Sequence, residues 1–150
     1  MQAIRITQAT IENLESLAKL FDKYRQFYKQ PSNLEQSKSF IRKRIENQDS
    51  VIFLALDHGG NVFGFTQLYP LFSSIFVKPK WVLNDLYVDE ILRSQGVARR
   101  LLNKAQELAI ETKADSIFLE TQVTNSSAQA LYESLGYVRE TDHFSYFLKI

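Results

Sequence analysis

The sequence predicts a mixed α/β fold, built on one sheet with helices on both of its faces. Three observations predict this class. Short apolar runs alternate with segments whose apolar residues recur every three or four positions, as in strands and helices. A cluster of turn residues, Asp57 to Asn61, joins two apolar runs and indicates an antiparallel hairpin. The helical segment 97–112 separates two further apolar runs, and such a crossover indicates parallel strands.

The length and composition indicate one globular domain, residues 1–150, with enough chain to bury a core. The sequence has no cysteine, which excludes disulfides, thiolate metal sites and a cysteine nucleophile, and which fits a reducing compartment. The first ten residues lack the apolar run of a signal peptide, and no stretch is long enough to span a bilayer. We therefore expect a cytoplasmic protein without a membrane partner.

The first half of the chain is expected to order as β-α-α-β-β. Thr10 can cap a helix whose apolar stripe reaches Tyr28, and Pro31 ends it. Ser32 and Glu35 have capping-box spacing and predict a second helix. The expected ranges are strand 3–7, helix 11–28, helix 32–47, strand 51–56 and strand 62–69.

The second half is expected to continue as β-α-β-α-β-β. Asn125 can cap a short helix, and Gly136 suits its C-terminal end. A final hairpin is predicted from the last two apolar runs. The expected ranges are loop 70–80, strand 81–88, helix 97–112, strand 116–121, helix 125–135, and hairpin strands 137–139 and 144–149.

The stretch RSQGVARRLL, residues 93–102, opens one of these helices. The first N–H groups of a helix lack partners inside it and lie at the positive end of its dipole, so they can hold an anion. Gly96 permits a close approach to the backbone, and Arg93, Arg99 and Arg100 add positive charge. Neither a P-loop nor a dinucleotide fingerprint is present. Two interpretations stay open on these residues alone: a phosphate-binding turn, or a plain turn with arginines in solvent.

Two motifs resemble segments of the GNAT N-acetyltransferase superfamily. LNDLYVDEILRSQGVARRLL is similar to the family's acetyl-CoA-binding segment, Q/R-x-x-G-x-G/A after the fourth strand, with Arg93, Gly96 and Ala98 in the three places. NSSAQALYESLGYV resembles the next segment, N-x-x-A-x-x-L/F-Y-x-x-x-G-F/Y; its matching residues are Asn125, Ala128, Leu131, Tyr132, Gly136 and Tyr137. The resemblance implies a GNAT-like, mostly antiparallel twisted sheet with a splayed cofactor cleft, and acetyl-CoA as co-substrate.

The resemblance also implies where acetyl-CoA binds. The pantetheine arm would pair with the strand backbone at Leu86, Tyr87 and Val88, and Asn125 and Tyr132 would border the cofactor. The pyrophosphate would lie on the backbone amides of the turn, formed by Arg93, Ser94, Gln95, Gly96, Val97, Ala98 and Arg99.

Tyr132 matches the family's usual general acid. When an amine attacks a thioester the leaving group is a thiolate, which a nearby phenol can stabilise or protonate. The periodicity of its helix instead favours a core aromatic, and both roles are compatible if the ring is buried and the hydroxyl exposed.

The general base is not fixed by the sequence. In polyamine-acetylating relatives a strand that resembles LNDLYV carries a glutamate as base, but this chain has Asn84 there, which cannot take a proton at neutral pH. Asp85 and Glu120 are the candidates. A water, a backbone carbonyl or an already neutral amine are alternatives. The missing cysteine favours direct attack in a ternary complex.

The LNDLYV strand resembles the branch of the family that acetylates small amines, polyamines or amino acids, so we expect a small primary amine as acceptor. Tyr28, Asn84 and Glu120 are the predicted substrate-binding residues. Aromatic residues could hold an amine by stacking or cation–π contact, or could be ordinary packing: Tyr24, Phe27, Tyr28, Phe72, Phe76 and Trp81. The alternatives are a non-catalytic acetyl-CoA sensor and an enzyme that acetylates a protein N-terminus or lysine.

Other partners are not indicated. The formal net charge of +1 argues against nucleic acid, and the basic run Arg42 to Arg44 is expected to be a solvated helix face. His58 and His143 are far apart in sequence without companion ligands, so no metal site is expected. The resemblance makes a homodimer through the C-terminal strands plausible.

Overall fold

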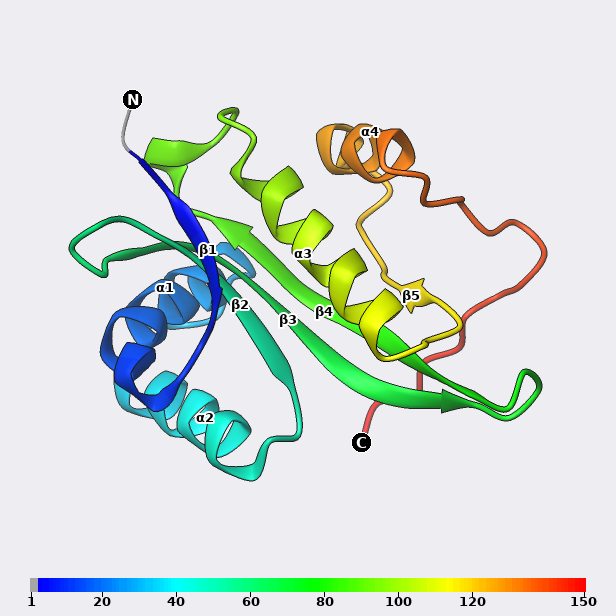
Figure 1. Cartoon of the computed structure of the whole chain (residues 1–150), viewed down its shortest axis with the longest axis horizontal. Helices are drawn as coiled ribbons and strands as arrows, with labels where there is room; N and C mark the ends of the chain where they lie inside the picture. The colour runs from blue at the N-terminus through cyan, green and yellow to red at the C-terminus, as the bar shows by residue number, and fades with distance from the viewer. Residues whose placement is uncertain (1–2) are drawn as a thin grey trace. The chain divides into compact units, whose positions relative to one another are not determined.

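The computed structural model describes residues 3–150. It divides the chain into two compact units, one up to Leu119 and the other from Glu120 to Ile150. The first unit holds all five strands and three of the four α-helices (Figure 1).

The sheet of the first unit has the strand order β1-β2-β3-β4-β5. Three neighbouring pairs are antiparallel, and β4 and β5 are parallel across the connection that contains α3, as the crossover predicted. The mixed, mostly antiparallel α/β sheet is therefore confirmed. The strands are β1 (Arg5–Gln8), β2 (Val51–Leu56), β3 (Val62–Ser73), β4 (Lys78–Val88) and β5 (Ile117–Phe118).

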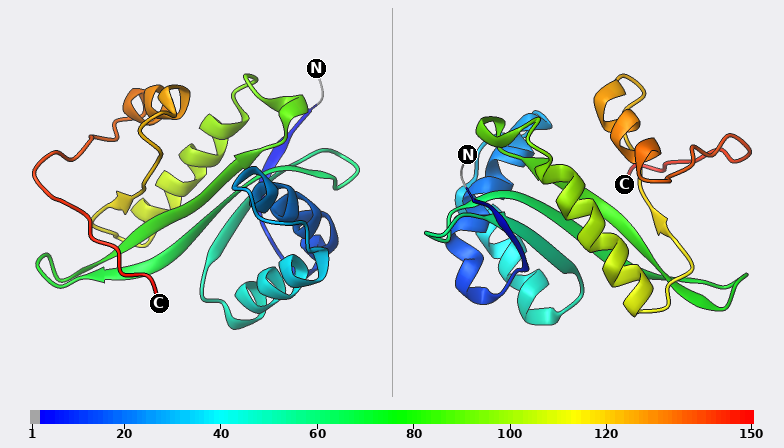
Figure 2. Two further views of the ribbon diagram at one scale, coloured as in Figure 1. Left: turned by 180° about the vertical axis from the view of Figure 1, so that it is seen from behind. Right: turned by 45° about the horizontal axis from the view of Figure 1, so that its top comes forward.

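Helices cover both faces of this sheet (Figures 1 and 2). On one face α1 (Leu14–Phe27), entered through a short 3-10 turn, packs with α2 (Leu34–Asn47) over a buried cluster that includes Phe21 and Phe65. On the other face lies α3 (Val97–Glu111). There a Cβ at Gly64 would come within 3.4 Å of Leu101 Cδ1, so this glycine permits the close approach of α3 to the sheet.

The hairpin of β3 and β4 is longer than the sequence indicated, and the predicted loop 70–80 is wrong. Both strands continue through it, with Pro70 paired to Trp81. Pairing of β2 to β3 ends at Leu68, so Pro70 lies where β3 has β4 as its only neighbour. A proline without an N–H is tolerated at such an edge.

The start of α2 also differs from the capping box predicted at Ser32. Asn33 is the N-cap and accepts a hydrogen bond from the N–H of Gln36. Ser32 instead donates its hydroxyl to the buried carboxylate of Asp22, at 2.6 Å, and Ser37 and the N–H of Asn33 donate to the same group at 2.9 Å each. Asp22 therefore ties α1 to the first turn of α2.

Asp22→Asn is expected to lower the free energy of unfolding by about 2 kcal/mol at neutral pH, because the amide cannot accept all of these bonds. Burial would raise the pKa of the Asp22 carboxyl, but the bonds from Ser32, Asn33 and Ser37 outweigh it, and the pKa lies below its usual value. This carboxylate thus adds stability above the unfolded pKa of about 3.9, and the contribution is lost as pH falls through the folded pKa. Urea unfolding across pH tests this. The difference in free energy of unfolding between the wild-type protein and Asp22→Asn should disappear in acid. The control Asp115→Asn, at an exposed position, should show no such difference at any pH.

The second unit contains α4 (Ser126–Ser134), with Asn125 as N-cap and Gly136 at a φ of 93°, both as predicted. The predicted strand 116–121 is reduced to β5, which ends at Phe118. The predicted hairpin of 137–139 and 144–149 is wrong, since residues 137–150 form no strand. The apolar side chains of this segment are exposed, Phe144 by 90% and Tyr146 by 94%, and an isolated two-stranded ribbon without a covered face is marginal in water.

Candidate active site

The parallel pairing of β4 with β5 stops early. Only Trp81 and Val82 of β4 pair with β5, opposite Ile117 and Phe118. The rest of β4, to Val88, has β3 on one side and no strand on its other side among residues 3–150. This is the splay that the family resemblance implied.

An extra residue disturbs β4 beyond this point. Gln67 pairs with Asp85 and Leu68 with Leu83, so Asn84 is unpaired and forms a β-bulge. A bulge bends the strand and re-aims nearby side chains, and such irregularities are common beside active sites. Asn84 is exposed, whereas Asp85 is buried.

The unpaired edge of β4 offers backbone groups. The N–H of Asp89 donates to the carbonyl of Phe63 on β3. Because main-chain groups alternate between the two edges of a strand, those of Leu86 and Val88 face away from β3. The Val88 carbonyl accepts a hydrogen bond from Arg93 Nε at 2.9 Å.

The turn after β4 leads into α3 without a capping side chain. Gly96 is the N-cap, with φ 79° and ψ 8°, and it makes no side-chain cap hydrogen bond to the first N–H groups of α3. The first bond back into the helix runs from the N–H of Arg100 to the Gly96 carbonyl, so the N–H groups of Val97, Ala98 and Arg99 precede it. A Cβ at Gly96 would meet no atom within 4 Å, so open space lies over this turn.

Arg93 is exposed at the rim of the turn, but its guanidinium is also bound to the protein. Its Nε bonds the Val88 carbonyl, and its guanidinium lies over the ring of Tyr87 at 5.4 Å and over that of Phe27 at 5.9 Å. The side chain is still 41% exposed. Arg93 thus fixes the turn to the end of β4 while keeping its charge near the N-terminus of α3.

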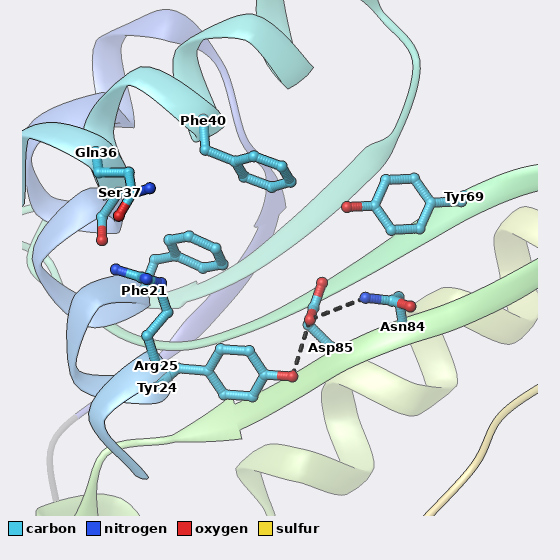
Figure 3. Close-up of a pocket in the computed structure, with 9 residues that line it drawn as sticks. All are labelled: Phe21, Tyr24, Arg25, Gln36, Ser37, Phe40, Tyr69, Asn84 and Asp85. Atoms are coloured by element: carbon cyan, nitrogen blue, oxygen red, sulfur yellow. Dashed lines mark hydrogen bonds between the residues drawn. The ribbon is translucent and has the colours of Figure 1, made fainter. Parts of the chain in front are cut away.

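Asp85 presents a buried carboxylate on the face covered by α1 (Figure 3). It accepts hydrogen bonds from Tyr24 Oη at 2.8 Å, Gln67 Nε2 at 2.8 Å and Asn84 Nδ2 at 3.1 Å. All three donors are neutral, and no Lys or Arg among the described residues forms a salt bridge with Asp85. A buried carboxylate without a cationic partner favours the binding of a cation.

A pocket of about 230 Å³ opens between α1, α2, β3 and β4 beside this carboxylate (Figure 3). Burial, followed by the negative charge of Asp85, raises the pKa of Tyr69 to about 12 and raises that of Tyr24 further. Both phenols therefore stay neutral at physiological pH. The pocket is lined by Phe21, Tyr24, Arg25, Gln36, Ser37, Phe40, Tyr69, Asn84 and Asp85.

This lining differs from the aromatic set suggested by the sequence. Trp81 is buried and donates to Thr112, the C-cap residue of α3, and Phe72 and Phe76 are exposed near the tip of the long hairpin. Tyr28 lies outside the lining, with its ring against Tyr24 at 5.1 Å.

Sequence reasoning missed six residues of the pocket: Phe21, Arg25, Gln36, Ser37, Phe40 and Tyr69. A signal existed for Tyr69, because strand alternation places it on the face of Phe65 and Gln67. Arg25 and Phe40 carry no signal of their own, since only the packing of α1 against α2 brings them to the pocket.

The remaining predicted site residues belong to the second unit. Asn125 caps α4, Tyr132 is half-buried on that helix with its ring 5.8 Å from that of Tyr137, and Glu120 is exposed. Burial raises the pKa of Tyr137 to about 12, and its hydroxyl has no hydrogen-bond partner in the described chain.

Within residues 3–150 no three His, Asp or Glu side chains gather as metal ligands would. No helix in that range has both the length and the apolar character to cross a bilayer. The basic run on α2 is paired in part, with Arg42 near Glu46 at 3.9 Å and Arg44 near Asp49 at 3.1 Å.

Comparison with known proteins defines the class as an acetyltransferase. The model of the Acetyltransferase (GNAT) family matches residues 14–137. An uncharacterized N-acetyltransferase, YhfO, of Bacillus subtilis is 40% identical over 147 residues, which are 98% of each chain. A probable acetyltransferase of Haemophilus influenzae is 30% identical over 117 residues, 78% of this chain and 80% of its own. The chain therefore belongs to the GNAT acetyltransferase family and is an enzyme of the acyltransferase class.

Solved structures agree with this assignment. The crystal structure of a probable acetyltransferase has a TM-score of 0.92 with 47% sequence identity, over 97% of both chains. An aminoglycoside N-acetyltransferase in complex with CoA has a TM-score of 0.80 over 99% of this chain and 96% of its own; at 18% identity it supports the fold alone.

Proposed function

We propose that residues 1–150 form a single N-acetyltransferase domain that transfers an acetyl group from acetyl-CoA to a primary amine of a small molecule. The observation that carries this proposal is the arrangement along β4 in the first unit. Strand β4 presents the buried carboxylate of Asp85 to a pocket. Beyond Asp85 one backbone edge of β4 has no neighbouring strand, and the turn after β4 leads to the N-terminus of α3, whose N-cap Gly96 makes no side-chain cap hydrogen bond.

The residues present fit acetyl-CoA, which would supply the activated thioester. The N-terminal N–H groups of α3, which the N-cap Gly96 cannot bond with a side chain, and the open space over Gly96 suit a pyrophosphate. The free edge of β4 at Leu86 and Val88 suits the amides of a pantetheine arm, which could pair there as an added strand. Ser94, with a φ of 61°, and Gln95 complete the turn.

The acceptor amine would enter the pocket that Asp85 borders. Asp85 can attract the ammonium and accept its proton, directly or through a water, and Tyr24, Gln67 and Asn84 orient the carboxylate. The neutral amine then forms the N–C bond as the C–S bond of the thioester breaks, giving an amide and a thiol. Asn84 also lines the pocket and can bond the acceptor.

The roles of Glu120, Asn125, Tyr132 and Tyr28 rest on the motifs rather than on geometry. Tyr132 is proposed to stabilise or protonate the thiolate, Asn125 to border the pantetheine, and Glu120 and Tyr28 to contact the acceptor. A homodimer and a cytoplasmic location likewise stay predictions.

Relatives support both a small-molecule and a protein acceptor. A thialysine N-epsilon-acetyltransferase of Caenorhabditis elegans is 28% identical over 98% of this chain, and its name gives a small amine as substrate. N-alpha-acetyltransferase 30 of Homo sapiens is 43% identical, but over 42% of this chain only. The small volume of the pocket, about 230 Å³, and the ring side chains that line it favour the small molecule.

Release of the CoA thiol over a panel of small amines and N-terminal peptides tests the proposal. Turnover of amines by the wild-type protein is expected. Turnover of peptides alone would overturn the small-molecule assignment, and binding of acetyl-CoA without any turnover would favour the sensor alternative.

Asp85→Asn is expected to lower kcat/KM for the amine by about a hundredfold or more, because an amide can neither attract the ammonium nor take its proton. The melting temperature should fall moderately, because the amide cannot accept all the hydrogen bonds that Tyr24, Gln67 and Asn84 donate to the carboxylate. Steady-state kinetics and thermal unfolding measure the two effects. Wild-type kinetics in this variant would exclude Asp85 as the base.

A further inference from the structure

The charges that line the pocket beside Asp85 have opposite signs. Arg25 and Asp85 are its only ionised lining residues; Arg25 comes from α1 and Asp85 from β4. Figure 3 shows Arg25 on the helical side, near Gln36 and Ser37, and Asp85 on the sheet side with Asn84. The cavity is therefore positive at one end and negative at the other.

The guanidinium of Arg25 has hydrogen-bonding capacity to spare. Its Nη1 is buried without an acceptor, and Arg25 forms no salt bridge within the described chain. The nearby carboxylate of Asp22 already accepts from Ser32, Ser37, the Asn33 N–H and Gln26, all neutral donors. The charge of Asp22 acts on Arg25, but the half-buried guanidinium keeps a buried Nη1 without a bonded acceptor, and such a group can recognise a carboxylate.

The wall between the two charged ends is apolar. The rings of Phe21 and Phe40 stack with centroids 5.6 Å apart and an interplanar angle of 3°. Both line the pocket, together with the neutral phenols of Tyr24 and Tyr69. Such a wall suits a hydrocarbon or aromatic body rather than a chain of further charges.

We infer that the acceptor is an amino acid: a molecule with a primary amine, an apolar body, and a carboxylate that Arg25 binds while the amine lies at Asp85. This inference rests on the proposed function and narrows its substrate class. It also predicts selection against polyamines, because a second ammonium would face the positive charge of Arg25.

Matched acceptors that differ only at the far end test the inference. Each series keeps the amine and the chain length: γ-aminobutyrate, n-butylamine and putrescine, and then δ-aminovalerate, n-pentylamine and cadaverine. In whichever series has the higher kcat/KM values, the amino acid should exceed the alkylamine in kcat/KM by about tenfold or more. The diamine of that series should have the lowest kcat/KM of the three.

Arg25→Met should remove that preference, lowering kcat/KM for the amino acid by about tenfold or more and changing the alkylamine by less than about twofold. Arg25→Gln serves the same purpose if the Met variant does not fold. Lys19→Met removes an exposed charge from the same helix and should leave the ranking unchanged. Diamines preferred over amino acids, or a ranking that survives the loss of Arg25, would overturn the inference while the small-amine function stands.

Binding separates the inference from the proposed function. Calorimetric titration of each amino acid into the wild-type protein with CoA present should give saturable binding that Arg25→Met abolishes. If no amine is acetylated but this binding is found, the proposed function fails and the inference holds. If no amino acid of either series binds, the inference fails.

Discussion

Gly96→Val is expected to raise the Kd for acetyl-CoA by about a hundredfold or more. The valine side chain would fill the open space over the turn and block the approach of an anion to the N–H groups of Val97, Ala98 and Arg99. Loss of roughly 3 kcal/mol of hydrogen bonding to a charged group corresponds to that factor. Calorimetric titration with acetyl-CoA measures it.

The control for this variant is Gly60→Val in the turn between β2 and β3. Gly60 has a φ of 82° and also has no atom within 4 Å of a Cβ, so both variants carry the same left-handed strain at an open position. Both should destabilise the chain to a similar degree, and Gly60→Val should keep its affinity for acetyl-CoA. Equal loss of affinity in the two variants would attribute the effect to strain and remove the phosphate-turn assignment.

Tyr132→Phe is expected to lower kcat by about a hundredfold, the effect typical of a positioned general acid, and to leave the Kd for acetyl-CoA nearly unchanged. The ring and its packing against Tyr137 remain in the variant, so a loss of turnover would report the hydroxyl alone. Single-turnover measurements across pH separate this effect from slow product release.

Tyr137→Phe is the matched control, since it removes a phenol hydroxyl from the same unit. The hydroxyl of Tyr137 is buried without a partner, so its removal should be neutral or slightly stabilising and should leave kcat unchanged. If Tyr132→Phe keeps full turnover at every pH, Tyr132 is not the acid.

Local features of the candidate site could be predicted from the sequence. The polar run before residue 97 indicated a helix start, and the structure begins α3 there with Gly96 in the left-handed region that glycine adopts readily. Asn125 and Gly136 bound α4 as predicted, because capping depends on residues within one helical turn.

Features that depend on a distant partner could not be predicted. The bulge at Asn84 exists because Gln67 and Leu68 of another strand pair with the residues on either side of it. A proline predicts the end of a strand, and whether a strand tolerates Pro70 depends on where β2 stops pairing with β3. Nothing in the sequence of α1 distinguishes Arg25 from other charged helix residues. It becomes part of the pocket only because α1 packs against α2 and the sheet.

Titration of the wild-type protein with acetyl-CoA, followed by thermal unfolding, tests the central claim most directly. A ligand that binds only the folded state stabilises it by about 2.7 kcal/mol at a hundred times its Kd, so the melting temperature should rise with concentration. We predict a rise that grows with the logarithm of the concentration for the wild-type protein and for Gly60→Val, and the same rise only at about a hundredfold higher concentration for Gly96→Val. An unchanged melting temperature of the wild-type protein at millimolar acetyl-CoA would contradict the assignment of β4 and the N-terminus of α3 as the cofactor site.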